Sequence, residues 1–126
     1  MAKQFSLNTQ LTSPGGVFSK SIGVTCGASA EVAEEAVAAG TDTLVNIAFP
    51  YANVKAYYLY SSTDATLETN SSSSPSQTIT LAAGVPKVWI EGGDGTNVFT
   101  ANVTKFYLTN VANTVFTAIV AYDPTP

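Results

Sequence analysis

Apolar and polar residues alternate with a period of two along much of the chain, the pattern of strands that bury one face. The alternation is clearest in "NVKAYYLY" (53–60), "PKVWIE" (86–91) and "VTKFYLTN" (103–110). In the first segment it places Val54 with Tyr58 on one face and Tyr57 with Leu59 on the other. The segment "TVFTAIVAY" (114–122) is apolar on both faces. We therefore expect it in the middle of the structure or against a neighbouring subunit.

Turn-forming residues separate these segments at short intervals, and examples are "SPGG" (13–16), "STD" (62–64), "SSSSPS" (71–76) and "GGDG" (92–95). Short strands divided in this way are typical of all-β proteins. We predict one antiparallel β-sandwich domain over residues 1–126, of the jelly-roll or immunoglobulin-like type, with about eight strands and hairpin-length connections. Residues 1–12 are expected to form an extended N-terminal arm.

The segment "SAEVAEEAVAA" (29–39) is ambiguous. Its residues favour a helix, which Ser29 would cap and in which Val32 and Val37 would belong to an apolar stripe. The strand-like segment "TLVNIAF" that follows, and the all-β setting, favour an extended strand instead. We predict the strand.

The stretch "EGGDGTN" (91–97) poses a choice between a metal-binding loop and a bend between two strands. Glu91, Asp94 and Asn97 carry oxygen atoms of the kind that calcium prefers. Their spacing, however, is not that of an EF-hand loop. The glycines and the "DG" dipeptide suit a tight hairpin, so we predict a turn and no metal site.

Composition and charge narrow the range of functions. Hydrophobic residues make up 45% of the chain and charged residues 11%, against about 25% charged in an average domain. The net charge is −4, and the five positive charges are lysines scattered singly along the chain. Without a basic cluster we expect no nucleic-acid partner. No apolar run reaches the length of a membrane span, and no signal peptide precedes the first strand, so we expect neither membrane insertion nor secretion.

The chain offers few residues that suit catalysis. The chain has no histidine, so its serines lack the usual base of a triad. Glu31, Glu34 and Glu35 lie together in one segment and suit a solvated face better than a pair of catalytic carboxyls. Cys26 is the single cysteine and is expected to be a small buried hydrophobe. We predict that the protein is not an enzyme, with no catalytic residues and no cofactor.

Aromatic residues are the more informative group, because exposed Trp and Tyr either stack on sugars or anchor protein interfaces. For Trp89 we favour the core or a subunit interface over contact with a ligand. The candidate interface residues are Phe5, Leu7, Trp89, Tyr107, Phe116 and Tyr122.

Residues 35–126 resemble a group of small β-sandwich proteins from the virions of tailed bacteriophages. The segments that carry the resemblance are "VAAGTDTLVNIAF" (37–49), "LETN" (67–70), "LAAGVPKVW" (81–89), "FTANVTKFYLTN" (99–110) and "YDPTP" (122–126). The resemblance implies a non-enzymatic capsid decoration or cement protein, which binds the major capsid protein, often as a trimer. It also implies a virion location after synthesis in the host cytoplasm.

The mechanism expected of such a protein is additive binding, in which many symmetric copies gain avidity on a shell. The alternating segment "KQFSLNTQL" (3–11) suggests that the N-terminal arm extends a sheet of a neighbour. The alternative function is a carbohydrate-binding or receptor-facing module of a virion or tail, which would use Trp89 and the tyrosines.

Overall fold

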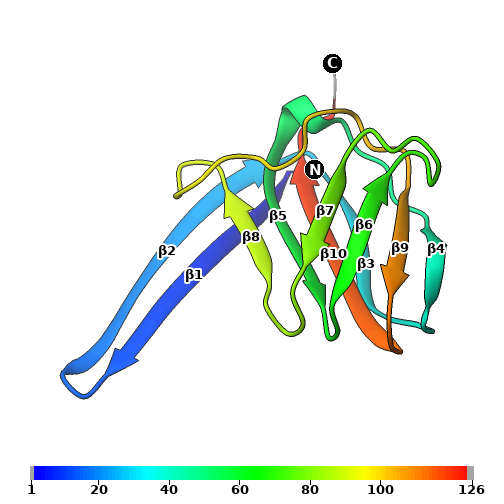
Figure 1. The fold of residues 1–126 in the computed structure, drawn as a ribbon. Helices are drawn as coiled ribbons and strands as arrows, with labels where there is room; N and C mark the ends of the chain where they lie inside the picture. The colour runs from blue at the N-terminus through cyan, green and yellow to red at the C-terminus, as the bar shows by residue number, and fades with distance from the viewer. Residues whose placement is uncertain (1, 125–126) are drawn as a thin grey trace.

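The computed structural model describes residues 2–124, and this part of the chain is mostly β-strand (Figure 1). The first residue of the arm and the last two residues of "YDPTP" lie outside the described residues. The elements are β1 (Lys3–Ser13), β2 (Gly16–Cys26), β3 (Ala28–Val37), β4 (Gly40–Val45), the 3-10 turn η1 (Tyr51–Asn53), β5 (Val54–Ser61), β6 (Ala65–Thr69), β7 (Thr78–Leu81), β8 (Lys87–Ile90), β9 (Phe106–Asn110) and β10 (Thr114–Tyr122).

Eight of the strands form two four-stranded antiparallel sheets, which confirms the predicted β-sandwich. One sheet, here called the β10 sheet, has the order β3-β10-β5-β8, and the other, the β9 sheet, has the order β4-β9-β6-β7. The remaining two strands of the described chain, β1 and β2, pair with each other and form a hairpin outside the sandwich (Figure 1).

The strand pairs are nested in sequence: β3 pairs with β10, β4 with β9, β5 with β8 and β6 with β7. The chain thus folds back on itself at the β6–β7 connection as a long antiparallel ribbon, which is rolled into two facing sheets. This arrangement is a jelly roll. Most connections therefore cross from one sheet to the other. The β3–β4, β5–β6 and β9–β10 links have the expected hairpin length, whereas the β6–β7 link, which joins neighbours in one sheet, is longer and covers residues 70–77.

The core lies between the two sheets and is centred on aromatic rings. The ring of Phe49 is 4.8 Å from that of Phe99, and Phe99 also contacts Tyr57 and Phe106 at 5.4 and 6.2 Å between centroids. The side chain of Phe106 is completely buried. The doubly apolar segment 114–122 is β10, which lies between β3 and β5 as the pattern predicted.

Residues 29–39 fall mainly in strand β3, so the prediction of a strand is confirmed. The backbone of β10 supplies hydrogen-bonding partners along almost the whole length of β3. This pairing outweighs the local preference of residues 29–39 for a helix. The ladder is interrupted at Glu34, where φ is +49° and the pairing register shifts. There the Glu34 N–H donates to Thr117 Oγ1 at 3.0 Å instead.

Two details of the predicted strands are wrong. The register of β5 shifts near its start, so Val54 is buried with Tyr57 and Leu59 rather than sharing a face with Tyr58. Strand β9 begins at Phe106 rather than at Val103, because Val103 forms an isolated bridge to Phe49. Strict alternation cannot reveal either irregularity, since each depends on a partner strand.

Replacing Phe106 by alanine is expected to lower the free energy of unfolding by about 3–5 kcal/mol, because it leaves a cavity at a fully buried site. Urea denaturation followed by the fluorescence of Trp89 measures this change. Phe18→Ala is the matched control, since Phe18 is 61% exposed on the hairpin, and its effect should stay within about 0.5 kcal/mol. Equal effects of the two substitutions would contradict the assignment of the core.

Candidate interaction surface

The hairpin of β1 and β2 is the most distinctive feature outside the sandwich. Its eleven paired positions run from Lys3↔Cys26 to Ser13↔Gly16, and its turn lies far from both sheets (Figure 1). At the usual rise per residue, strands of this length span roughly 35 Å. The predicted arm is therefore one strand of a two-stranded ribbon, and one edge of β1 is already occupied by β2.

The two faces of the hairpin differ in chemistry, because cross-strand partners share a face. One face carries the pairs Phe5↔Val24, Leu7↔Ile22, Thr9↔Lys20 and Leu11↔Phe18, and we call it the apolar face. The opposite face is polar apart from Val17, and carries Gln4, Ser6, Asn8, Gln10, Thr12, Val17, Ser19, Ser21 and Thr25.

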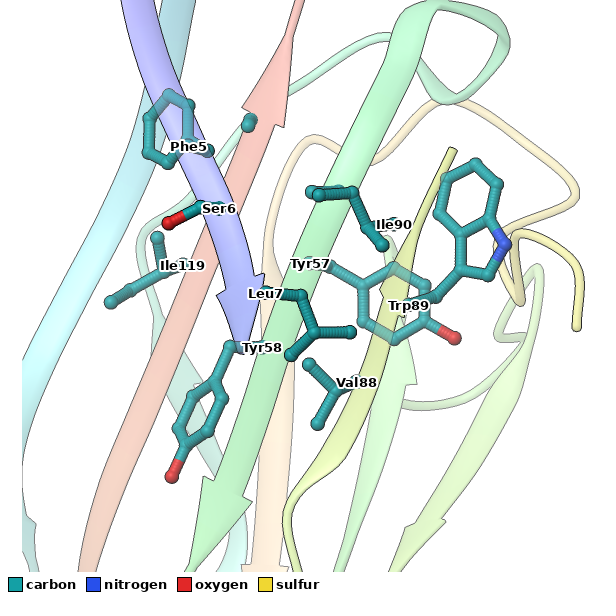
Figure 2. Close-up of a pocket in the computed structure, with 11 residues that line it drawn as sticks. Phe5, Ser6, Leu7, Tyr57, Tyr58, Val88, Trp89, Ile90 and Ile119 are labelled. Carbon is teal, nitrogen blue, oxygen red and sulfur yellow. The ribbon is translucent and has the colours of Figure 1, made fainter. Parts of the chain in front are cut away.

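The base of the hairpin packs its apolar face on the outer side of the β10 sheet. Figure 2 shows Phe5 and Leu7 of β1 above strands β5, β8 and β10, where they help to line a cavity of about 250 Å³. The outward side chain of Ile90 is only 1% exposed. Polar contacts also hold the base: the Gly27 N–H donates to Asp123 Oδ1 at 2.9 Å, and Lys3 Nζ donates to Ser29 Oγ at 3.0 Å.

The outer sides of the two sheets also differ. The β9 sheet presents mainly polar side chains to solvent: Thr66, Glu68, Thr78, Thr80, Tyr107 and Thr109. The β10 sheet continues beyond the hairpin base as a shallow groove of about 520 Å³, which we call the open face and in which apolar side chains are mixed with polar ones. It is lined by Ala33, Glu34, Tyr58, Tyr60, Val115, Thr117 and Ile119. Contiguous exposed apolar side chains on a folded domain mark an interaction surface.

The structure brings three of the predicted interface residues together. Phe5, Leu7 and Trp89 all line the cavity at the hairpin base. The Trp89 ring lies 6.1 Å from that of Tyr57, and its Nε1–H donates to the Gly95 carbonyl at 3.2 Å. Trp89 is thus half-buried and packs against the core rather than standing free as a platform.

The other three predicted interface residues lie apart. Phe116 is completely buried between the sheets, so its side chain is not available to a partner of the folded domain. Tyr107 is half-buried on the outer side of the β9 sheet, and Tyr122 packs at the end of β10. Leu11 and Phe18 were not among the predicted interface residues, although the alternation of residues 3–11 and 16–26 places them on one face.

The stretch 91–97 is a loop, as predicted, but it is not a hairpin, since it leads from β8 into the crossing to the other sheet. Gly92 and Gly95 supply positive φ angles of 90° and 83°. Two of the three candidate ligands have other partners: Glu91 pairs with Lys55 at 3.0 Å, and Asn97 Nδ2 donates to the Tyr51 carbonyl at 2.9 Å. Within residues 2–124, no group of three or more His, Cys, Asp or Glu side chains is placed to hold a metal.

The cysteine and the glutamates that were considered for chemistry lie at a buried strand end and on an exposed strand. Cys26 is buried at the end of β2, and its thiol lies 3.4 Å from the Ala28 carbonyl. Glu31, Glu34 and Glu35 are exposed along β3, which confirms the predicted solvated face.

In the part of the chain that is described, no helix is long and apolar enough to cross a lipid bilayer.

One carboxylate pair lies on the outer side of the β9 sheet. A hydrogen bond to Asp42 raises the pKa of Glu68 above its ordinary value of 4.5, and partial burial and the negative charge of Asp42 act in the same direction. The folded protein therefore holds this proton more tightly than the unfolded chain does. The associated stability is complete below pH 4.5 and is lost as the pH rises through the raised pKa.

Glu68→Gln should remove this part of the pH dependence, because the amide keeps a hydrogen-bond donor toward Asp42 at every pH. Thermal unfolding should be measured for the wild type and the variant from below pH 4.5 to neutral pH. The difference in melting temperature should grow in favour of the variant as the pH rises. Asp42→Asn should act in the same direction, and asparagine tolerates the positive φ of 54° at this position. A gap that is constant with pH would contradict the coupling.

Comparison of the chain with protein-family models, with curated proteins and with solved structures found no match.

Proposed function

We propose that this protein is a non-enzymatic structural component of a tailed-bacteriophage virion, which binds the outside of the capsid as a decoration or cement protein. The observation that carries the proposal is the hairpin, a ribbon of roughly 35 Å that projects from a compact jelly roll with Leu11 and Phe18 exposed at its far end. A projecting arm with an apolar tip is suited to contact with a neighbouring molecule.

The distribution of chemistry supports a role based on surfaces. Apolar side chains gather on the hairpin and on the outer side of the β10 sheet, whereas the carboxylates of β3 are exposed and Cys26 is buried. Such a domain binds by shape and apolar contact. On a symmetric shell, weak contacts of this kind add up through avidity. In this proposal the major capsid protein is the principal partner and the protein acts as a homo-oligomer, with a trimer favoured.

A carbohydrate-binding or receptor-facing role is the second candidate. The rings of Tyr58 and Tyr60 are stacked on the open face at 6.4 Å between centroids, and Tyr58 is 37% exposed. Stacked aromatic rings of this kind suit contact with a sugar face. Jelly rolls occur in both viral shells and lectins, so the fold is compatible with either function.

If the proposal is correct, the purified protein should co-sediment with capsids of the phage that encodes it and should raise the temperature at which those capsids release their DNA. Leu11→Ser combined with Phe18→Ser should weaken binding, since the contact of the apolar tip with a neighbouring molecule of the shell, a capsid subunit or another copy, is lost while the sandwich is untouched. Loss of glycan-array binding in Tyr58→Ala, together with no affinity for capsids, would instead favour the carbohydrate-binding role.

A further inference from the structure

We propose that the tip of the hairpin docks on the open face of a second copy of this chain, so that copies join arm to sheet. The inference concerns contacts between copies and does not require the proposed binding to a capsid. It rests on three observations: the exposed tip, the open face and the charges of the two surfaces.

The donor surface is the far half of the apolar face of the hairpin. At the base, this face is covered because Phe5 and Leu7 pack on the β10 sheet of their own domain. At the tip, the same face is uncovered, and Leu11 and Phe18 are 68% and 61% exposed. The hairpin thus carries one continuous contact face, of which its own domain covers only the near half.

The acceptor surface is continuous with the surface that already receives the hairpin base. Tyr58 and Ile119 line both the cavity under the base and the groove of the open face. Val115, at the far end of this groove, is 42% exposed. The β10 sheet therefore offers a second hairpin the same kind of apolar outer surface that it offers to its own.

The charges of the two surfaces are complementary, which favours a second copy as the occupant. Residues 3–26 carry Lys3 and Lys20 and no acidic residue. Lys20 lies on the apolar face between the base and the tip. On the acceptor side, Glu34 lines the groove, and Glu31 pairs with Ile119 at its edge. Lys20 of one copy can thus approach these carboxylates of the next.

Contact between two different surfaces of one chain is head-to-tail, and such contacts close into rings when the rotation between copies permits. A small cyclic oligomer is therefore expected, in which each copy donates one hairpin and accepts another.

Adjacent substitutions at the tip provide a matched test. Phe18 and Val17 are both 61% exposed, but they point to opposite faces of the hairpin. Light scattering coupled to size-exclusion chromatography should show an oligomer for the wild type. Phe18→Ser should weaken self-association by about tenfold or more, as expected for loss of an aromatic anchor, whereas Val17→Ser should leave it unchanged. Thermal melts establish that both variants are folded.

The acceptor is tested separately by charge exchange. Lys20→Glu should weaken self-association, and so should the double variant Glu31→Lys, Glu34→Lys. Combining all three substitutions in one chain should restore it, because the attraction is re-formed with reversed signs. Val115→Lys should weaken assembly without any change in the hairpin.

A wild type that stays monomeric at every accessible concentration would overturn the inference, and so would equal effects of Phe18→Ser and Val17→Ser. Assembly that responds to Phe18→Ser but not to Val115→Lys, with no rescue by charge exchange, would also overturn it, because the acceptor would lie elsewhere. Binding of capsids by a monomeric wild type would refute docking between copies and would leave the proposed binding to capsids standing. Oligomers that do not bind capsids would support docking between copies and would count against the proposed binding to capsids.

Discussion

The pairing of β3 with β10 is the constraint on which the rest of the structure depends. It joins the first and the last strand of the sandwich and fixes the outermost pair of the nested jelly-roll ladder. β10 is also paired with β5 on its other edge, so it is enclosed by hydrogen-bonded neighbours on both sides. Closing pairs so distant in sequence costs chain entropy, and the burial of Phe116, Ala118 and Val120 against the core offsets that cost.

The same strand explains why the molecule has an interaction surface. A central strand that is apolar on both faces buries one face in the core and must find cover for the other. The base of the hairpin covers the end near Ala121, where Phe5 and Leu7 line the cavity. Among residues 2–124, no segment covers the end near Val115 in this way. The open face is therefore the part of the β10 sheet that its own hairpin does not reach.

Sequence patterns predicted the sandwich and most of its strands because burial of alternate side chains is a local signal. They were less informative about the loop 91–97, where a "DG" turn suits a hairpin but the chain crosses to the other sheet. They also misplaced Val54, because a register shift in the ladder with β10 reverses its side. The predicted interface residues proved to lie in different places, because local alternation does not show which surface covers a buried side chain. Phe116 lies in the core between the sheets, whereas Phe5 lies on the hairpin.

The sequence by itself determined the all-β class and the doubly apolar character of residues 114–122. Each of these depends on the period and chemistry of neighbouring residues. Only the tertiary structure decided the nested strand order, the two-stranded form of the arm, and which apolar face stays open. These features depend on pairing between segments far apart in the chain, and a local alternation specifies that a face is buried without specifying what covers it.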